Sequence, residues 1–389
     1  MVALGDLVRP GMRIAISDGA GGPRSLYPEL TRIALQHRDL GLVLGWMPHD
    51  EPDLDPGAFA DARTVMPGWG LRRHVAAGTL RSVPARLSAM PALLAGPLRP
   101  DLLLATLVRT PDGLRFGAEV SWMRGAVDAG VPVAAVVSST APHCDAGPPL
   151  PPDAVTVLAE VDDAPREVPT EAPGEVETAI AAHVARLVPE GARVQVGPGR
   201  LGTALLGALR VPVRVDSGLL PEGVVDLDER GLLVEAIAAY LVGTKRLYDW
   251  ADGRPLLRPV EYTHDPSRLC SDDPAPFIAC NTAIEIDVDG QVNVEGTASA
   301  VVGGIGGHAD YAAAGTRSRG GLSVVAVASE HRGRSTLVRT LSRPVTTASH
   351  DVDVVVTERG SVALRGLDRA ERAAALLELW DGKVFERSR

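Results

Sequence analysis

The sequence is poor in lysine, cysteine and aromatic residues. Lysine occurs only at Lys245 and Lys383, and the three cysteines are Cys144, Cys270 and Cys280. These cysteines have no metal-type spacing, and their odd number does not form a disulfide framework. A reducing compartment therefore fits the chain best. Aromatic residues make up 4% of the sequence, so no aromatic platform indicates a particular ligand.

The sequence also has no excess of basic over acidic residues and no long apolar runs. The net charge of −10 argues against a nucleic-acid partner, whose binding surface on a protein is basic, although local basic pockets for an anionic ligand stay open. No stretch has 18 uninterrupted apolar residues, which argues against a membrane span. The N-terminal "MVALGDLVRPGMRIAIS" has no basic start followed by a long apolar run, so no signal peptide is expected. We expect a cytoplasmic protein.

Short apolar runs that alternate with helical patterns indicate the fold class. The apolar runs lack a clean period of two, as expected for strands covered on both faces. Strand alternating with helix predicts an α/β fold with a mostly parallel sheet. The predicted strands lie at 13–17, 42–47, 101–108 and 131–139, and helical patterns lie at 24–38 and 121–130.

A Pro-rich, acidic stretch at about 145–173 separates two halves with the same pattern. A predicted strand at 155–161 lies inside this stretch and completes the first half. The second half restarts with "ARVQVGPGRLGTALLGAL", which reads as strand, small-residue turn and helix, like "MRIAISDGAGGPRSLYPEL" near the N-terminus. We predict two related open α/β domains in tandem, at 1–165 and 172–389, with a surface connection between them.

Three glycine-rich turns could carry chemistry: "SDGAGGP" at 17–23, "GPGRLG" at 197–202 and "VVGGIGGHADY" at 301–311. Exposed backbone N–H groups in such loops can wrap a phosphate or hold a developing oxyanion. The alternative is a tight turn that needs positive φ. The turn at 197–202 also fits G-x-G-x-x-G, with Asp216 nearby, so a nicotinamide cofactor is a weak rival interpretation.

Several longer stretches resemble the acetyl-CoA hydrolase/acetate CoA-transferase family. The resemblance runs in order from about 175 to 380, and the N-terminal half is similar more loosely. The stretches that carry it are "ARVQVGPGRLGTAL", "SGLLPEGVVDLDERGLL", "GTKRLYDWADGRP", "FIACNTAIEIDVDGQVN", "GGIGGHADYAAAGTRSRGGLSVVAVAS" and "ASHDVDVVVTERGSVALRG".

The resemblance implies two open α/β domains of the CoA-transferase type with an acyl-CoA substrate lying between them. Coenzyme A is then substrate or product, with small carboxylic acids as partners, no permanently bound cofactor and no metal; a homodimer is compatible with it. In the family a glutamate attacks the thioester while glycine turns hold the oxyanion. The implied positions are Gly197, Gly199 and Gly218 for the acyl group, and Gly303, Gly304, Gly306 and Gly307 for CoA.

The family's nucleophilic glutamate is missing, because Gly218 occupies its place in "VRVDSGLLPEGVVDL". Glycine cannot act as a nucleophile, so the family's covalent route cannot start there. Glu119, at a predicted helix start, is a candidate general base or an acid that interacts with the helix dipole. His308 is a second candidate base or a loop histidine. Glu222 and Glu285 match common family acids, which favours structural roles.

Three functions stay open. The first is an enzyme that hydrolyses or transfers CoA thioesters. The second is hydrolytic C–C cleavage of a CoA conjugate assisted by Glu119 or His308. The third is a non-catalytic CoA-binding homologue. The nicotinamide oxidoreductase rests on one glycine pattern and is the weakest alternative.

Overall fold

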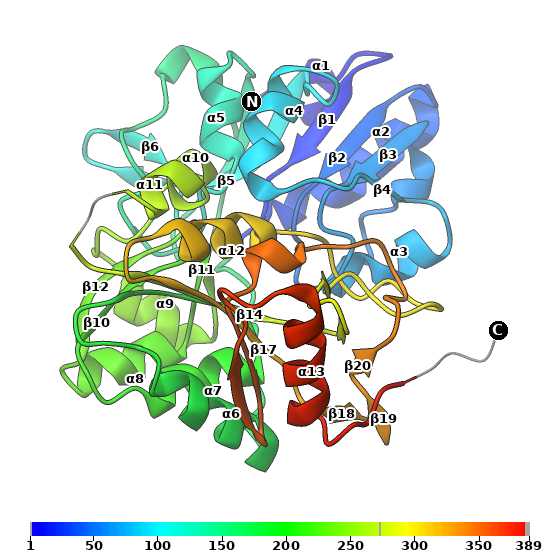
Figure 1. Cartoon of the computed structure of the whole chain (residues 1–389). Coiled ribbons are helices and arrows are strands. Elements are labelled where there is room, and N and C mark those ends of the chain that lie inside the picture. The colour runs from blue at the N-terminus through cyan, green and yellow to red at the C-terminus, as the bar shows by residue number, and fades with distance from the viewer. Residues whose placement is uncertain (1, 272–273, 386–389) are drawn as a thin grey trace. The chain divides into compact units, whose positions relative to one another are not determined.

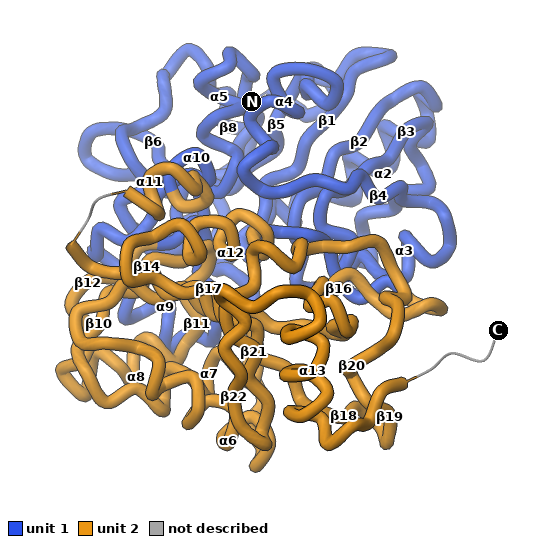
Figure 2. Tube along the Cα trace, in the orientation of Figure 1, with its two compact units in different colours: residues 1–168, 238–262, 301–306 blue, residues 169–237, 263–300, 307–389 orange. Residues whose placement is uncertain are grey.

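A computed structural model describes residues 2–271 and 274–385 of the chain (Figure 1). The described chain divides into two compact units, drawn in blue and orange in Figure 2. Unit 1 comprises Met1–Val168, Ala238–Tyr262 and Val301–Gly306, and unit 2 comprises Pro169–Ile237, Thr263–Ala300 and Gly307–Arg389. The chain first passes between the units after residue 168. The sequence did not indicate that 238–262 and 301–306 would join the first unit, and the domain bounds 1–165 and 172–389 stay a prediction.

Unit 1 is built on one sheet with the strand order β4-β3-β2-β1-β5-β7-β8, and β6 pairs with β5. All neighbours along this order are parallel, and the β5–β6 pair is antiparallel. The strands are β1 (Arg13–Ile16), β2 (Gly41–Leu44), β3 (Asp61–Thr64), β4 (Arg81–Ser82), β5 (Leu102–Thr110), β6 (Gly113–Arg115), β7 (Val133–Ser138) and β8 (Val155–Val161); β13 (Tyr240–Val242) also belongs to unit 1.

The helices of unit 1 are short apart from α2. They are α1 (Leu4–Leu7), α2 (Tyr27–His37), α3 (Arg72–Ala76), α4 (Met90–Ala95), α5 (Met123–Asp128) and α9 (Lys245–Ala251), and α10 (Val260–Thr263) begins in this unit. The central strands are buried along most of their length, as β7 is at every residue. This two-sided burial explains why the predicted strands show continuous apolar runs.

Unit 2 repeats the arrangement with the strand order β12-β10-β9-β14-β17-β21-β22. Every neighbouring pair is parallel except the final β21–β22 pair. The strands are β9 (Arg193–Val196), β10 (Val213–Asp216), β12 (Leu233–Ile237), β14 (Phe277–Thr282), β17 (Leu322–Ala326), β21 (Val354–Thr357) and β22 (Gly360–Ala363). The short strands of this unit are β11 (Leu219–Pro221), β15 (Glu285–Asp287), β16 (Val292–Asn293), β18 (Glu330–His331), β19 (Arg334–Ser335) and β20 (Leu337–Val338).

The helices of unit 2 connect these strands and cover its sheet (Figure 1). The last helix begins with a capping box, in which the side chain of Asp368 accepts from the Glu371 N–H and that of Glu371 accepts from the Asp368 N–H. The helices are α6 (Glu175–Ala185), α7 (Arg200–Ala208), α8 (Gly223–Glu229), α11 (Pro266–Leu269), α12 (His308–Arg317) and α13 (Arg369–Leu379).

Both sheets reverse their strand order at the first strand of the unit. In unit 1 the chain proceeds outward from β1 through β2 in one direction and through β5 in the other; in unit 2, β9 has the same place between β10 and β14. The predicted α/β class with mostly parallel sheets is confirmed. Open parallel sheets bind ligands at the carboxyl ends of the strands beside such a reversal, so each unit has one edge at which a ligand is expected.

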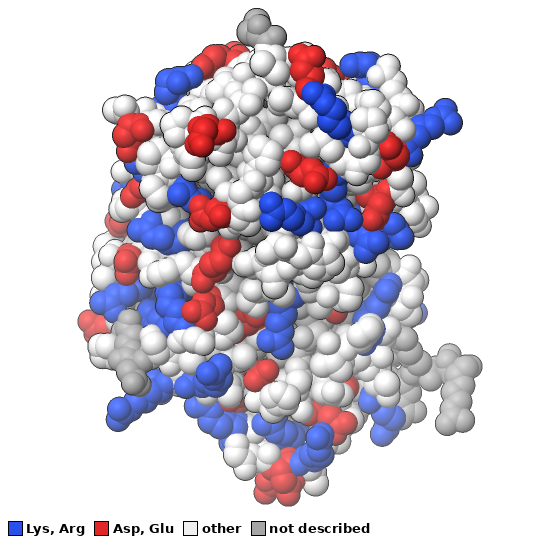
Figure 3. All heavy atoms as spheres, turned by 90° about the horizontal axis from the view of Figure 1, so that it is seen from above, with Lys and Arg blue, Asp and Glu red and all other residues white. Residues whose placement is uncertain are grey.

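The hydrophobicity of the helices and the distribution of surface charge bear on possible partners. In the part of the chain that the structure describes, no helix is long and apolar enough to cross a membrane. Acidic and basic side chains are interspersed over the face drawn in Figure 3, and among the described residues of that face they form no continuous basic surface of the kind that binds nucleic acid.

Candidate functional site

Glu119 lies inside the first glycine-rich turn of unit 1. Its Oε1 accepts a hydrogen bond of 3.0 Å from the Gly21 N–H. A β-carbon at Gly21 would come within 2.6 Å of that oxygen, and one at Gly19 within 2.9 Å of the Glu119 side chain. Gly19 also has a φ of +109°. The turn after β1 therefore needs glycine in order to hold this carboxyl group.

The carboxyl group of Glu119 is almost completely enclosed. The residue is 6% exposed, and Oε2 has no hydrogen-bond partner among the described residues. Burial, with a smaller contribution from the nearby Asp18 carboxylate, raises the pKa of Glu119 to about 8. At neutral pH the group is mostly protonated. Its unpaired oxygen is available to a ligand or a water molecule, with a pKa close to that of an effective acid–base catalyst.

A buried polar network fixes the segment that carries Glu119. Asp18 Oδ2 accepts from the Ser121 hydroxyl at 2.6 Å and from the Tyr240 hydroxyl at 2.5 Å. The backbone around Glu119 forms an antiparallel bridge with that around Tyr240, and the Val120 N–H donates to Ala239 O at 3.0 Å. Burial raises the pKa of Asp18 to about 6. Two carboxyl groups with separated pKa values thus share the edge at β1.

The helix-dipole explanation of Glu119 is wrong. Helix α5 begins at Met123, and its N-cap is Trp122. Glu119 precedes the cap by three residues and pairs with strand-like backbone instead. Since the dipole acts within the first turn of a helix, it does not account for an acid at this position.

The turn at 197–202 lies at the carboxyl end of β9 in unit 2. Gly199 is the N-cap of α7 with φ +90°, so glycine relieves backbone strain there. Gly202 lets the helix approach Gly197 O, which would lie 2.1 Å from a β-carbon at 202. A β-carbon at Gly197 or Gly199 would meet nothing within 4 Å. The turn therefore presents open space at the two positions that the resemblance assigns to the acyl group.

Gly218 lies at the carboxyl end of β10, next to the turn after β9. The Ser217 hydroxyl donates to Val196 O at 3.0 Å and so joins the two strand ends. A β-carbon at 218 would meet the His264 ring at 2.9 Å and the Tyr311 hydroxyl oxygen at 3.0 Å. The side chains of His264 and Tyr311 therefore occupy the space that a side chain at position 218 would need.

Asp216 is bound by arginines. Arg268 donates to its two carboxylate oxygens at 2.7 and 2.9 Å, and Arg193 lies 3.8 Å away. Asp216 is 3% exposed. An acid engaged in this way is not available to bind a ribose hydroxyl, which removes the support for a nicotinamide cofactor.

His308, the second predicted base, is held at both ring nitrogens. Nε2 lies 2.9 Å from Thr282 O, and Nδ1 lies 2.7 Å from the Thr347 hydroxyl oxygen. Because a carbonyl oxygen only accepts, Nε2 carries the proton and Nδ1 accepts from the threonine. Burial lowers the pKa of His308 to about 4. This arrangement favours a neutral imidazole that ties the start of α12 to the end of β14.

The glycines at 303–306 belong to unit 1 and pack against backbone from its N-terminal part. The Leu87 N–H donates to Gly306 O at 3.0 Å. A β-carbon at Gly304 would lie 2.8 Å from Val65 O, and one at Gly68 would lie 3.0 Å from Gly303 Cα. Gly307, in unit 2, lies against His264 and Tyr311, each 2.6 Å from its β-carbon position. Close packing explains Gly304 and Gly307, and a φ of +58° explains Gly306. The contact of these glycines with CoA stays a prediction.

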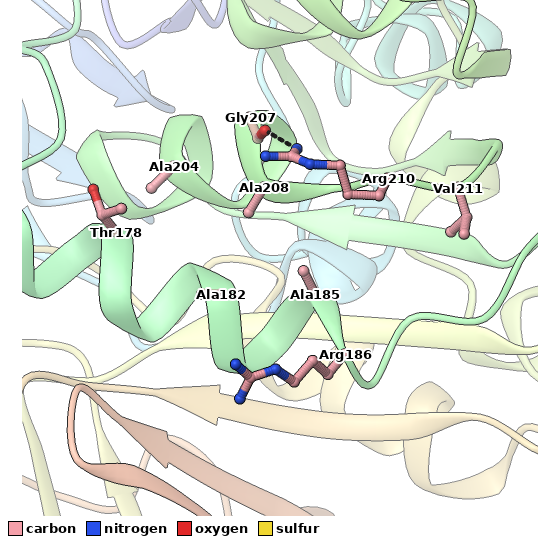
Figure 4. Close-up of a pocket in the computed structure, with 9 residues that line it drawn as sticks. All are labelled: Thr178, Ala182, Ala185, Arg186, Ala204, Gly207, Ala208, Arg210 and Val211. Atoms are coloured by element: carbon pink, nitrogen blue, oxygen red, sulfur yellow. Dashed lines mark hydrogen bonds between the residues drawn. The ribbon is translucent and has the colours of Figure 1, made fainter.

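Two hollows in unit 2 were not indicated by the sequence. Alanines of α6 and α7 line one of about 480 Å³, and Arg186 and Arg210 flank it (Figure 4). Arg210 donates to Gly207 O at 2.7 Å, so its guanidinium is partly engaged. The second hollow, of about 960 Å³ and named here the basic hollow, is lined by His331, Arg332 and Arg334 and also by the acid Glu285. The Arg334 guanidinium lies 5.5 Å from the centre of the Phe385 ring.

The sequence did not indicate which residues surround Glu119 and Gly218. Asp18 stands in the recognised turn "SDGAGGP", so its place beside β1 was a usable signal. Ser121 and Tyr240 are 119 residues apart, and His264 and Tyr311 have no motif in common. Glu222 occupies the N-cap position of α8. Glu285 accepts from the Asn293 side chain and the Ser342 N–H, in accord with a structural role. Among the described residues, no group of three histidine, cysteine, aspartate or glutamate side chains is placed to hold a metal ion.

Comparison with known proteins gives consistent matches. The model of the acetyl-CoA hydrolase/transferase C-terminal domain family matches residues 243–385. The 4-hydroxybutyrate coenzyme A transferase of Clostridium kluyveri is 29% identical over 230 residues, which are 55% of this chain and 53% of that protein. The chain thus matches about half the length of this relative.

Two further matches span nearly the whole chain. The succinyl-CoA:acetate/propanoyl-CoA:succinate CoA transferase of Fasciola hepatica is 26% identical over 398 residues, which cover 96% of this chain and 82% of that protein. The crystal structure of RipA from Yersinia pestis superposes with a TM-score of 0.84 at 23% identity, covering 96% of this chain and 91% of RipA. At this identity, the structural likeness establishes the fold.

Proposed function

We propose that the chain, whose residues 243–385 match the model of the acetyl-CoA hydrolase/transferase C-terminal domain family, processes acyl-CoA thioesters by hydrolysis. The relatives' names cover both transfer to an acid and hydrolysis. Gly218 distinguishes the two for this chain, because CoA transfer in the family passes through a glutamyl intermediate and glycine offers no nucleophile.

Glu119 is the proposed general base. The observation that supports this role most directly is its buried carboxyl group with one unpaired oxygen, held in a glycine turn at the strand-order reversal of unit 1. In its ionised form, Glu119 accepts a proton from water as the water oxygen attacks the thioester carbonyl carbon. The carbon–sulfur bond then breaks, and the proton passes to the CoA thiolate. The products are a carboxylic acid and free CoA.

CoA recognition is proposed for two places. The glycines Gly303, Gly304, Gly306 and Gly307 are the positions that the family resemblance implies. The basic hollow of unit 2 suits the phosphate groups of CoA, because Arg332 and Arg334 supply positive charge beside an aromatic ring. The proposed place for the rest of the acyl group is beside Gly197 and Gly199, where the turn leaves open space.

One assay tests the proposal. Acetyl-CoA and longer acyl-CoA esters are incubated with the protein, with and without a carboxylic acid acceptor, while free thiol and acyl exchange are followed. We expect thiol release without exchange and no covalent adduct within residues 213–227. Exchange of the acyl group onto added acid would contradict the hydrolytic assignment. Firm CoA binding without any turnover would contradict catalysis and favour a non-catalytic CoA-binding protein.

A further inference from the structure

Two polar side chains converge on Gly218 from separate elements of unit 2. His264 lies between α10 and α11, and Tyr311 lies in the first turn of α12. Measured from the β-carbon position of residue 218, His264 Nε2 lies at 2.9 Å and Tyr311 Oη at 3.0 Å. Their rings are tilted against each other with centroids 4.9 Å apart. Glycine at 218 is therefore what allows this pair to lie directly at the end of β10.

The Tyr311 hydroxyl has no hydrogen-bond partner among the residues that the structure describes. Its ring belongs to a core cluster with Leu269, Phe277 and Ala279, and the residue is 3% exposed. Oη makes no hydrogen bond to any described residue. Buried hydroxyls are nearly always paired, because an unpaired one keeps the cost of losing water. Phenylalanine would fill the same core without this cost, so the hydroxyl points to a ligand group at this place.

His264 is fixed and uncharged. Its Nδ1 lies 2.9 Å from the Thr263 hydroxyl oxygen, and the side chain is 1% exposed. Burial, with a smaller contribution from the Arg268 guanidinium, lowers the pKa of His264 to about 3. Arg268 follows four residues later and is clamped to Asp216, two residues before Gly218. The same ion pair thus fixes the His264 segment against the end of β10.

We propose that Tyr311 and His264 form a subsite for one uncharged oxygen atom, the carbonyl oxygen of a bound acyl thioester. This inference rests on the proposed hydrolytic function and deepens it. Tyr311 Oη donates to the carbonyl oxygen, and His264 adds a neutral polar contact beside it. A free carboxylate would need a cation, but the imidazole is neutral and Arg268 is engaged by Asp216. The subsite therefore selects the thioester over a carboxylate acceptor.

The test separates acyl recognition from CoA recognition. Calorimetry compares free CoA with acetyl and butyryl dethia analogues of acyl-CoA, in which a methylene replaces the thioester sulfur and prevents hydrolysis. Wild-type protein should bind an analogue more tightly than CoA. In Tyr311→Phe the affinity for that analogue should fall roughly three- to tenfold, the scale of one hydrogen bond, while CoA affinity stays unchanged.

Ser323→Ala is the matched control. It removes another buried hydroxyl without a partner, near the amino end of β17 and thus at the other end of the sheet from Gly218. This control should leave both affinities unchanged, and neither variant should lower the unfolding temperature. If Tyr311→Phe does not fold, Gly218→Ala replaces it, because its methyl group must displace His264 and Tyr311.

The outcomes are distinct. Loss of the preference for the analogue in Tyr311→Phe supports the subsite. Retention of the preference in that variant overturns it, as does equal weakening of CoA and analogue. A wild-type protein that binds CoA but prefers neither analogue overturns the subsite and leaves CoA binding intact. A wild-type protein that binds none of these ligands overturns the proposed function itself, and the subsite with it.

Discussion

At the scale of single residues, burial decides the chemistry of this protein more than residue type does. Glu119 and Asp18 are both acids at one strand end, yet burial raises the pKa of Glu119 to about 8 and that of Asp18 to about 6. Asp18 accepts several hydrogen bonds that stabilise its charged form, whereas Glu119 accepts one. The residue with fewer partners is therefore the one suited to exchange protons near neutral pH.

The first prediction concerns the pH dependence of turnover. If Glu119 is the general base, kcat/KM should rise with pH and level off above about 8, where the carboxyl group of the free enzyme is ionised. Glu119→Gln should lower kcat by roughly 10²-fold or more and abolish this rise. Stopped-flow thiol release between pH 5.5 and 9.5 measures both. A falling limb near pH 8 would instead assign Glu119 as an acid, and unchanged rates in the variant would exclude it.

The second prediction concerns stability. The pKa of Glu119 is about 8 in the folded protein and near its ordinary value of 4.5 in the unfolded chain. The folded state therefore binds more protons between these values, and the free energy of unfolding falls as pH rises through this window. From pH 6.5 to 8 we expect a loss of at most about 1.4 kcal/mol per pH unit. His264 and Asp18 change protonation at lower pH than this, because their pKa values in the folded protein are about 3 and about 6.

Urea unfolding at several pH values between 6.5 and 8 measures this slope, with Glu119→Gln as the matched variant. The glutamine keeps the size of the side chain and does not titrate, so its unfolding free energy should stay nearly constant over the range. Parallel slopes in the two proteins would show that Glu119 does not titrate in this window.

At the scale of elements, the glycine turns at the carboxyl ends of parallel strands have different reasons for glycine. Gly19 and Gly21 make room for a carboxyl group, and Gly199 adopts φ +90° at the start of α7. Gly197 has neither constraint, since no atom lies within 4 Å of its β-carbon position. A glycine without a structural reason at a strand end is the better probe of ligand binding.

The third prediction uses this contrast. Gly199→Ala should destabilise the protein by roughly 1–3 kcal/mol, because alanine rarely adopts this backbone conformation. Gly197→Ala should change stability by less than about 0.5 kcal/mol and still lower acyl-CoA turnover, because the methyl group projects into the open space. Thermal unfolding and thiol release are measured on both variants. Wild-type turnover in Gly197→Ala would place the acyl group elsewhere.

At the scale of the whole molecule, the chain crosses between its units several times. Residues 238–262 belong to unit 1 although they follow the first part of unit 2 in sequence. They are tied to the N-terminal part of unit 1 through the bridge between Glu119 and Tyr240 and through the Val168 N–H, which donates to Gly243 O at 2.8 Å. Proteolytic cleavage between the two halves of the sequence therefore leaves these contacts intact.

The fourth prediction concerns limited proteolysis. The Pro-rich stretch at 145–153 is held by backbone contacts, including the Leu150 N–H donating to Leu114 O at 2.8 Å. Residues 169–174 form no helix or strand, and the Glu171 side chain is 85% exposed. A glutamate-specific protease should therefore cut first after Glu171. The two fragments should stay together on native size-exclusion chromatography and separate in denaturant. Early cleavage at 145–153, or dissociation of the native fragments, would contradict this account.

The sequence by itself determined the α/β class and the central strands, and it carried the resemblance to a family whose C-terminal domain model matches residues 243–385. Buried parallel strands need continuous apolar residues and helices need a periodic face, so both leave local patterns such as "VAAVVS" in β7. It also pointed to Glu119 and Gly218, because an unexpected acid and a missing nucleophile are visible without coordinates.

Only the tertiary structure decided what surrounds these residues. Tyr240 reaches Asp18 across 222 positions of the chain, and Tyr311 reaches Gly218 across 93. Parallel strands bring their carboxyl ends to one edge whatever the length of the connection between them, and no local pattern records which side chains meet there. Burial, which sets the pKa values of Glu119, His264 and His308, is likewise a property of the packed unit.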